Sequence, residues 1–185
     1  MRALATALLL TAAASADARD GEAQKSSPRP PSSPPRAAQP STAAAIRDIR
    51  ARYAEVGRRL KSFRSVKRDA SGLSAEGGDL RAYFDRDTLR LVRATTYGEM
   101  GRAAHEVYYD EEGRPFFVFL KEARYARPFG RVASERTHRF YFRDRRMIRW
   151  LDGARQVSPA DPRYAAREKE VLDLADSLAE LARRP

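Results

Sequence analysis

From Asp79 to Leu151 the chain alternates between apolar and polar side chains, and this period restricts the fold more than any other feature. Successive side chains of an extended strand point to opposite sides, so a period of two indicates β-strands. Three tight turn sequences interrupt the pattern: Asp85-Arg86-Asp87, Glu111-Glu112-Gly113 and Asp144-Arg145. Strands joined by such short loops are antiparallel. We therefore predict about six antiparallel strands, at residues 79–85, 88–97, 102–110, 115–125, 135–143 and 146–151.

A pair of aromatic residues beside an acid recurs in this region: Tyr83-Phe84-Asp85, Tyr108-Tyr109-Asp110, and Tyr141-Phe142 with Asp144. The uneven spacing of these motifs indicates a recurring hairpin and not a solenoid repeat. The alternation predicts that the second aromatic residue of each pair faces the core and that the first, a tyrosine each time, faces solvent. Phe116–Leu120 is apolar at every position, which is typical of a central strand covered on both faces.

Amphipathic helices are predicted on both sides of the strands. Apolar residues recur at alternating steps of three and four over residues 46–63, after Ser41 or Thr42 as the N-cap. This seam packs on the chain's own sheet or, in the alternative interpretation, joins two copies in a homo-oligomer. A closing helix is expected to be capped by Asp161, with Pro162 at its first position.

These elements predict an α+β fold. It consists of an antiparallel β-meander with the N-terminal and the C-terminal amphipathic helix packed on one face. Residues 42–185 are expected to form this single domain, and a Pro- and Ser-rich disordered linker is expected over residues 19–41.

The first 18 residues have the pattern of a secretory signal peptide. Arg2 precedes a short apolar run, and small residues place the cleavage site near Ala16 or Ala18. The mature chain is then periplasmic or secreted, with no transmembrane segment. Export without any cysteine fits a bacterial periplasm better than a disulfide-stapled extracellular scaffold.

The composition is basic, with a formal net charge of +11. Such a charge favours anionic partners. Arg supplies 31 of the 36 basic residues, an imbalance that genome composition alone would also produce. The basic residues are spread along the chain and do not form a single patch, which disfavours nucleic acid as the partner.

The sequence offers little for catalysis or for a cofactor. It contains no Gly-x-Ser-x-Gly elbow, phosphate-cradling glycine motif or dinucleotide fingerprint, and its two histidines and lack of cysteine predict no metal site. His105 is expected to be a hydrogen-bonded histidine of the core. Glu76 and Glu99 lie beside glycines in loops, which let the backbone approach a ligand, so both are candidate binding residues. A hydrolase that uses these two carboxylates is the alternative function. Such sequences are also typical of ordinary tight turns.

The stronger hypothesis is a non-enzymatic binding or interaction protein. Its binding surface would be an Arg- and Tyr-rich sheet face formed by Arg81, Tyr83, Tyr108, Arg139, Tyr141, Arg143 and Arg149. Tyr and Arg are frequent anchors of interfaces. The partner is expected to be a protein or an acidic envelope polymer. A solvated sheet face without a partner is the alternative, because Tyr also favours strands.

Three short motifs in and between the predicted strands are distinctive. They are Glu76-Gly77-Gly78, Tyr97-Gly98-Glu99-Met100-Gly101 and Phe116-Phe117-Val118-Phe119. With these motifs, residues 46–152 resemble a group of uncharacterised secreted bacterial proteins. The resemblance implies export and a shared fold, and it implies no activity, cofactor or functional residue.

Overall fold

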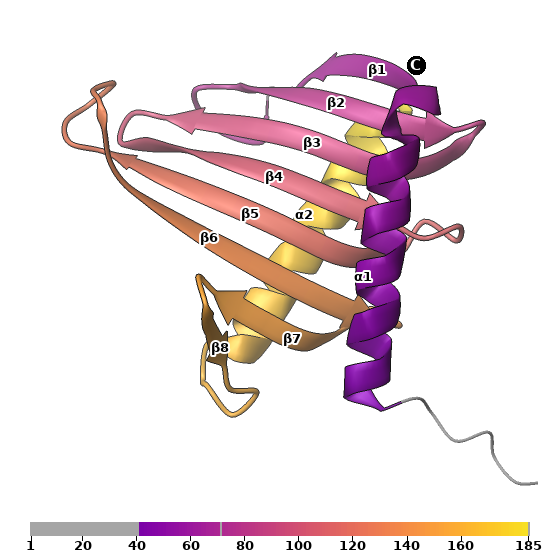
Figure 1. The fold of residues 1–185 in the computed structure, drawn as a ribbon. Helices are drawn as coiled ribbons and strands as arrows, with labels where there is room; N and C mark the ends of the chain where they lie inside the picture. Colours follow the sequence, from indigo (N-terminus) through magenta and orange to yellow (C-terminus); the bar gives the residue numbers. More distant parts are fainter. Residues whose placement is uncertain (1–40, 71, 185) are drawn as a thin grey trace, which may run out of the picture. The chain divides into compact units, whose positions relative to one another are not determined.

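The computed structural model describes residues 41–70 and 72–184, which form one antiparallel sheet and two long helices (Figure 1). The eight strands pair in chain order, so the sheet is a meander, as predicted. The elements are α1 (Thr42–Arg59), η1 (Leu60–Ser62), β1 (Arg64–Asp69), β2 (Gly78–Asp85), β3 (Thr88–Gly98), β4 (Gly101–Tyr109), β5 (Pro115–Tyr125), β6 (Val132–Arg143), β7 (Arg146–Asp152), β8 (Arg155–Val157) and α2 (Tyr164–Arg183). The predicted signal peptide, and the predicted linker except Ser41, lie outside the described residues.

Two of the eight strands, β1 and β8, were not expected from the sequence. β1 contains a single apolar side chain, Val66, so its pattern of burial is weak. β8 has only three residues. Both are edge strands, which bury fewer side chains than central ones and therefore carry a weaker period of two.

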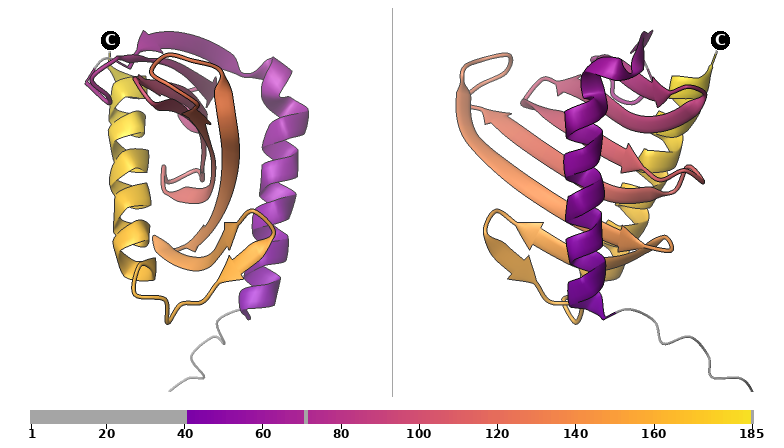
Figure 2. Two further views of the ribbon diagram at one scale, coloured as in Figure 1. Left: turned by 90° about the vertical axis from the view of Figure 1, so that its left-hand side faces the viewer. Right: turned by 45° about the vertical axis from the view of Figure 1, so that its right-hand side comes forward.

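The two helices cover opposite faces of the sheet, so the prediction that both pack on one face is wrong. The sheet curves around α2, and α1 crosses the strands on the other side (Figure 2). We call the α2 side the inner face and the α1 side the outer face. Inner-face residues such as Val107, Val118 and Phe140 cluster with α2, and Leu91, Phe117 and Tyr141 cluster with α1. Because both faces are apolar, each requires a covering layer.

The recurring aromatic pairs mark irregularities in strand pairing. The register shifts between Tyr83 and Phe84, between Tyr108 and Tyr109, and between Tyr141 and Phe142. Such bulges bend a strand and increase its twist. All three irregularities lie beside hairpin turns at the same end of the strands. The motif therefore contributes to the curvature of the sheet around α2 (Figure 2).

The first helix begins as the sequence predicts. The Ser41 side chain accepts a hydrogen bond from the Ala44 N–H at 3.2 Å, which satisfies one free donor of the first turn. Ile49 and Val56 of its seam pack on the chain's own sheet, which confirms that interpretation. A contact of this seam with a second copy stays a prediction.

The second helix begins two residues later than expected. Asp161 accepts hydrogen bonds in the turn before α2, from the backbone and the side chain of Arg163, and α2 itself has no side-chain cap. Neither helix of the described residues is long and apolar enough to cross a membrane.

Candidate functional site

One cross-strand row of the outer face lies beneath α1. The strand register places Tyr83, Leu91, Tyr108, Phe117 and Tyr141 side by side on β2 to β6. Tyr108 is 3 % exposed and Tyr141 is 4 % exposed, so the prediction that these tyrosines face solvent is wrong. The alternation put them on the correct face, but the apolar stripe of α1 covers that face.

The buried tyrosines belong to a packed aromatic layer. The Tyr108 ring centroid lies 5.0 Å from that of Tyr53 on α1, and the Tyr141 centroid lies 5.1 Å from that of Phe117. The Tyr108 hydroxyl donates to Glu106 Oε2 at 2.7 Å, and burial raises the pKa of Tyr108. Arg149 stacks its guanidinium over the Tyr141 ring at 5.9 Å. Truncation of Tyr108 would therefore disturb the fold, so it is unsuitable as a test of binding.

The adjacent row of the outer face, two residues away on each strand, is largely charged and is more accessible to solvent than the aromatic row. Its members share one register across β1 to β6: Lys67, Arg81, Arg93, Glu106, Phe119 and Arg139. We call these six residues the basic row. Lys67 and Arg93 are exposed, and the other four members are half-buried. Arg81 and Arg139 were predicted from the sequence, whereas Lys67 and Arg93 were not, because cross-strand register is needed to align them.

Two cavities adjoin the basic row. One, of about 380 Å³, lies beside α1 and is lined by Arg50, Tyr53, Phe117, Phe119, Arg139 and Tyr141, with Ile49 and Glu106. The other, of about 340 Å³, lies over β1 to β3 and is lined in part by Lys67, Arg81, Tyr83 and Arg93. Both volumes are within the usual size range of small-ligand sites.

The remaining predicted site residues lie elsewhere. Arg143 lines a cavity of about 570 Å³ near the N-terminal half of α1, together with Phe116 and Asp110. Glu76 and Glu99 are exposed in loops, and neither lines any of the cavities described here. The structure therefore groups Arg81, Tyr83, Arg139 and Tyr141 around the basic row but does not place Glu76 or Glu99 in a cavity.

The charges around the cavity beside α1 are not balanced. Among the described residues that line it, Glu106 is the only carboxylate, and it accepts from the Tyr108 hydroxyl and pairs with Arg93 Nε at 3.1 Å. Arg139 donates Nη2–H to the Gly153 carbonyl at 2.6 Å. Within residues 41–70 and 72–184, neither Arg50 nor Arg139 forms an ion pair with a carboxylate. The two guanidinium groups therefore leave a positive field that favours an anionic ligand.

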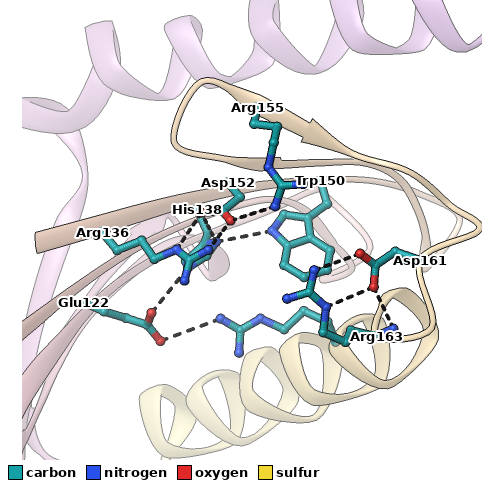
Figure 3. A network of polar contacts seen from close by, with 9 residues as sticks. Glu122, Arg136, His138, Trp150, Asp152, Arg155, Asp161 and Arg163 are labelled. Carbon is teal, nitrogen blue, oxygen red and sulfur yellow. Dashed lines mark hydrogen bonds and ion pairs between the residues drawn. The ribbon is translucent and has the colours of Figure 1, made fainter.

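A second polar cluster lies on the inner face, around His138 (Figure 3). The Trp150 indole N–H points to His138 Nδ1 at 3.3 Å, and Glu122 Oε2 lies 3.3 Å from Nε2. An indole N–H only donates, so Nδ1 accepts and the proton of the neutral ring is on Nε2, directed at Glu122. Burial lowers the pKa of His138. The ring is therefore neutral near pH 7.

Asp152, at the end of β7, also belongs to this cluster. It receives two hydrogen bonds from Arg136 and one from Arg155. The Arg136 hydrogen bonds hold the pKa of Asp152 at about 2. No cavity described here opens on His138. The contacts of the cluster join β5, β6, β7 and the start of β8, so it stabilises this part of the fold.

Acid titration of Trp150 fluorescence is expected to report on His138. A proton on Nδ1 removes the acceptor for the indole N–H, and the resulting imidazolium quenches the ring. The midpoint should lie below 6.5, because the pKa of His138 is lowered from that value. Trp150 is the only tryptophan, so the signal has one source.

The control is His138→Gln, which should abolish this transition. Glu122→Gln should move the midpoint further down, because the Glu122 charge favours the imidazolium. A midpoint at or above 6.5 in the unmodified chain would contradict the neutral, Trp150-bound ring.

The described residues contain no group of three His, Asp or Glu side chains that could hold a metal ion. Comparisons of the chain with protein-family models, with curated proteins and with solved structures find no match. The functional interpretation therefore depends on the geometry of the outer face.

Proposed function

We propose that this chain is a binding protein that holds an anionic partner on the outer face of its sheet, beside α1. One observation carries the proposal: Arg50 of α1 and Arg139 of β6 flank an aromatic-walled cavity in which the single carboxylate, Glu106, is already bound. Guanidinium groups without a carboxylate partner bind carboxylates or phosphates by charge-assisted hydrogen bonds.

The cavity walls favour a ligand that also has apolar surface. Tyr53, Phe117 and Tyr141 supply aromatic faces, and Phe119 continues this surface along the basic row. A ligand site typically combines apolar walls with a few polar groups that fix orientation. The expected export of the chain makes an acidic polymer or an acidic protein of the envelope the proposed partner.

The alternative function, hydrolysis by Glu76 and Glu99, stays a prediction. Both side chains are exposed. Neither side chain lines a cavity described here, so the structure offers no enclosed site for a substrate beside them.

Binding of anilinonaphthalene sulfonate tests the proposed site, because this probe combines aromatic rings with one negative charge. Neutral N-phenylnaphthylamine is the matched probe without the charge. The double substitution Arg50→Gln and Arg139→Gln is expected to weaken sulfonate binding about tenfold. It should leave binding of the neutral probe unchanged. Fluorescence titration at low salt measures both affinities, and added salt should weaken only the sulfonate.

The matched control is the double substitution Arg47→Gln and Arg131→Gln. Both arginines are exposed, and neither lines a cavity described here, so the control removes the same charge without changing the site. If the sulfonate binds the Arg50/Arg139 variant and the unmodified chain equally well, the proposed site is wrong.

A further inference from the structure

The basic row is much longer than the cavity beside α1. It crosses six strands, from Lys67 on β1 to Arg139 on β6. Neighbouring strands are about 4.8 Å apart, so the row extends for roughly 24 Å. A small anion bound between Arg50 and Arg139 does not reach Lys67 or Arg81. A ligand that contacts the whole row has to be linear and to lie across the strands.

We propose that the ligand is a linear polysaccharide carrying carboxylate groups, laid along the basic row beside α1. This inference rests on the proposed function and specifies its ligand class. The row contains four cations and one anion, Glu106, which is already engaged by Arg93 and Tyr108. The planar guanidinium groups of Arg81 and Arg139 match the two oxygens of a carboxylate.

The shape of the face suits an extended chain. α1 runs across strands of this face (Figure 1), and its residues Arg50 and Tyr53 line the cavity at the Arg139 end of the row. The cavity over β1 to β3 lies at the other end of the row and is lined by Lys67 and Arg81. The two cavities therefore provide a binding site for each end of a linear ligand.

The surroundings of the row favour a sugar chain over a peptide. The backbone groups of β2 to β6 are already used within the sheet. A peptide that crosses the strands could not form the backbone hydrogen bonds by which a peptide joins a sheet along an edge. Sugar hydroxyl groups need only side-chain partners, and Tyr83 and Thr95 supply these beside the cations.

The same surroundings disfavour nucleic acid. Proteins that bind nucleic acid tightly often neutralise six or more phosphates. Here the basic row contributes four cations and α1 contributes Arg50, which is fewer, and Asp79 and Glu135 lie near them on the outer face. The mixed charge suits an acidic chain that also carries many hydroxyl groups, because these can pair with the polar side chains between the cations.

A length series of oligogalacturonates tests the proposal on the full chain. Affinity measured by calorimetry should rise with oligomer length and level off once the extended oligomer reaches roughly 24 Å. The double substitution Lys67→Gln and Arg81→Gln should weaken binding of the long oligomers about tenfold. It should leave the shortest oligomer and the sulfonate probe unaffected, because both occupy the end beside α1.

The matched control is Lys61→Gln with Arg124→Gln. Lys61 and Arg124 are exposed and line none of the cavities described here, so the same charge is removed away from the row. Thermal unfolding of both variants checks that the fold is retained. Methyl-esterified oligomers, which lack the charge, should bind at least tenfold more weakly.

Three results would overturn the polysaccharide proposal: affinity independent of length, no effect of Lys67→Gln with Arg81→Gln, or oligothymidylate binding as tightly as oligogalacturonate at the same salt concentration. The proposed function would survive the first two if Arg50→Gln with Arg139→Gln still weakened the sulfonate. Loss of that effect would overturn both proposals.

Discussion

Acidification from pH 7 to pH 4 is expected to lower the free energy of unfolding by about 3 kcal/mol through His105 alone. This side chain is 7 % exposed, and within the described residues its Nδ1 has no hydrogen-bond partner. Burial lowers the pKa of His105 from 6.5 to about 4. Glu122 and Glu170 favour the imidazolium and Arg167 opposes it, but burial is the largest effect.

The direction of the effect follows from where the proton binds. Below pH 6.5 the unfolded chain takes up a proton at His105, whereas the folded chain does so only near pH 4. The stabilisation is therefore complete above pH 6.5, decreases as the pH falls to 4, and changes no further below that. Each pH unit in this window corresponds to about 1.4 kcal/mol. His138 acts in the same direction, since its pKa is also lowered.

Urea unfolding at several pH values measures this dependence. In His105→Leu most of the slope between pH 6.5 and 4 should disappear, and in the double variant with His138→Gln the remainder should disappear. Asp152 acts in a separate window, because its pKa is about 2 and its stabilisation is lost only as the pH falls below about 4. A slope above pH 4 that persists in the double variant would show that other groups cause it.

Replacement of Tyr109 by alanine is expected to destabilise the fold by about 4 kcal/mol. Tyr109 is completely buried between the sheet and α2. Its hydroxyl donates to the Ala175 carbonyl of α2 at 2.7 Å. Removal of the ring leaves a cavity in the larger of the two clusters and also removes this link to the helix. Since small domains are stable by only about 5 to 15 kcal/mol, the loss is a large fraction.

The matched variant Tyr109→Phe separates packing from hydrogen bonding. It keeps the ring and should cost only about 1 kcal/mol. Trp150 fluorescence during urea unfolding measures both variants. A loss below about 2 kcal/mol for Tyr109→Ala would mean that the cluster collapses around the missing ring.

The faces of the strands could be predicted because alternation is a local property. Tyr108 and Tyr109 do lie on opposite faces, and Tyr108 and Tyr141 do share one. The expected exposure of Tyr108 was wrong because it assumed that one face remains open. The apolar run Phe116–Leu120 already indicated cover on both faces, and this signal agrees with the structure.

The site was predictable only in part. Arg81, Tyr83 and Arg139 could be assigned to the outer face from alternation alone. Lys67 and Arg50 could not, since Lys67 lies on an edge strand with a weak apolar period and Arg50 reaches the site from a helix. Their proximity depends on strand register and on the position of α1, and neither leaves a signal in a single chain.

The amino-acid sequence by itself determined the antiparallel order of the central strands, the two amphipathic helices and the side chains that share a face. These follow from side-chain period and turn chemistry, which act over a few neighbouring residues. Only the tertiary structure decided which helix covers which face, and hence that the aromatic row is buried while the basic row beside it is accessible. The physical reason is that an apolar helix stripe can pack on either apolar face, so its sequence does not show which face it covers. Both faces must be covered in the folded chain, because an uncovered face would expose a large apolar surface to water.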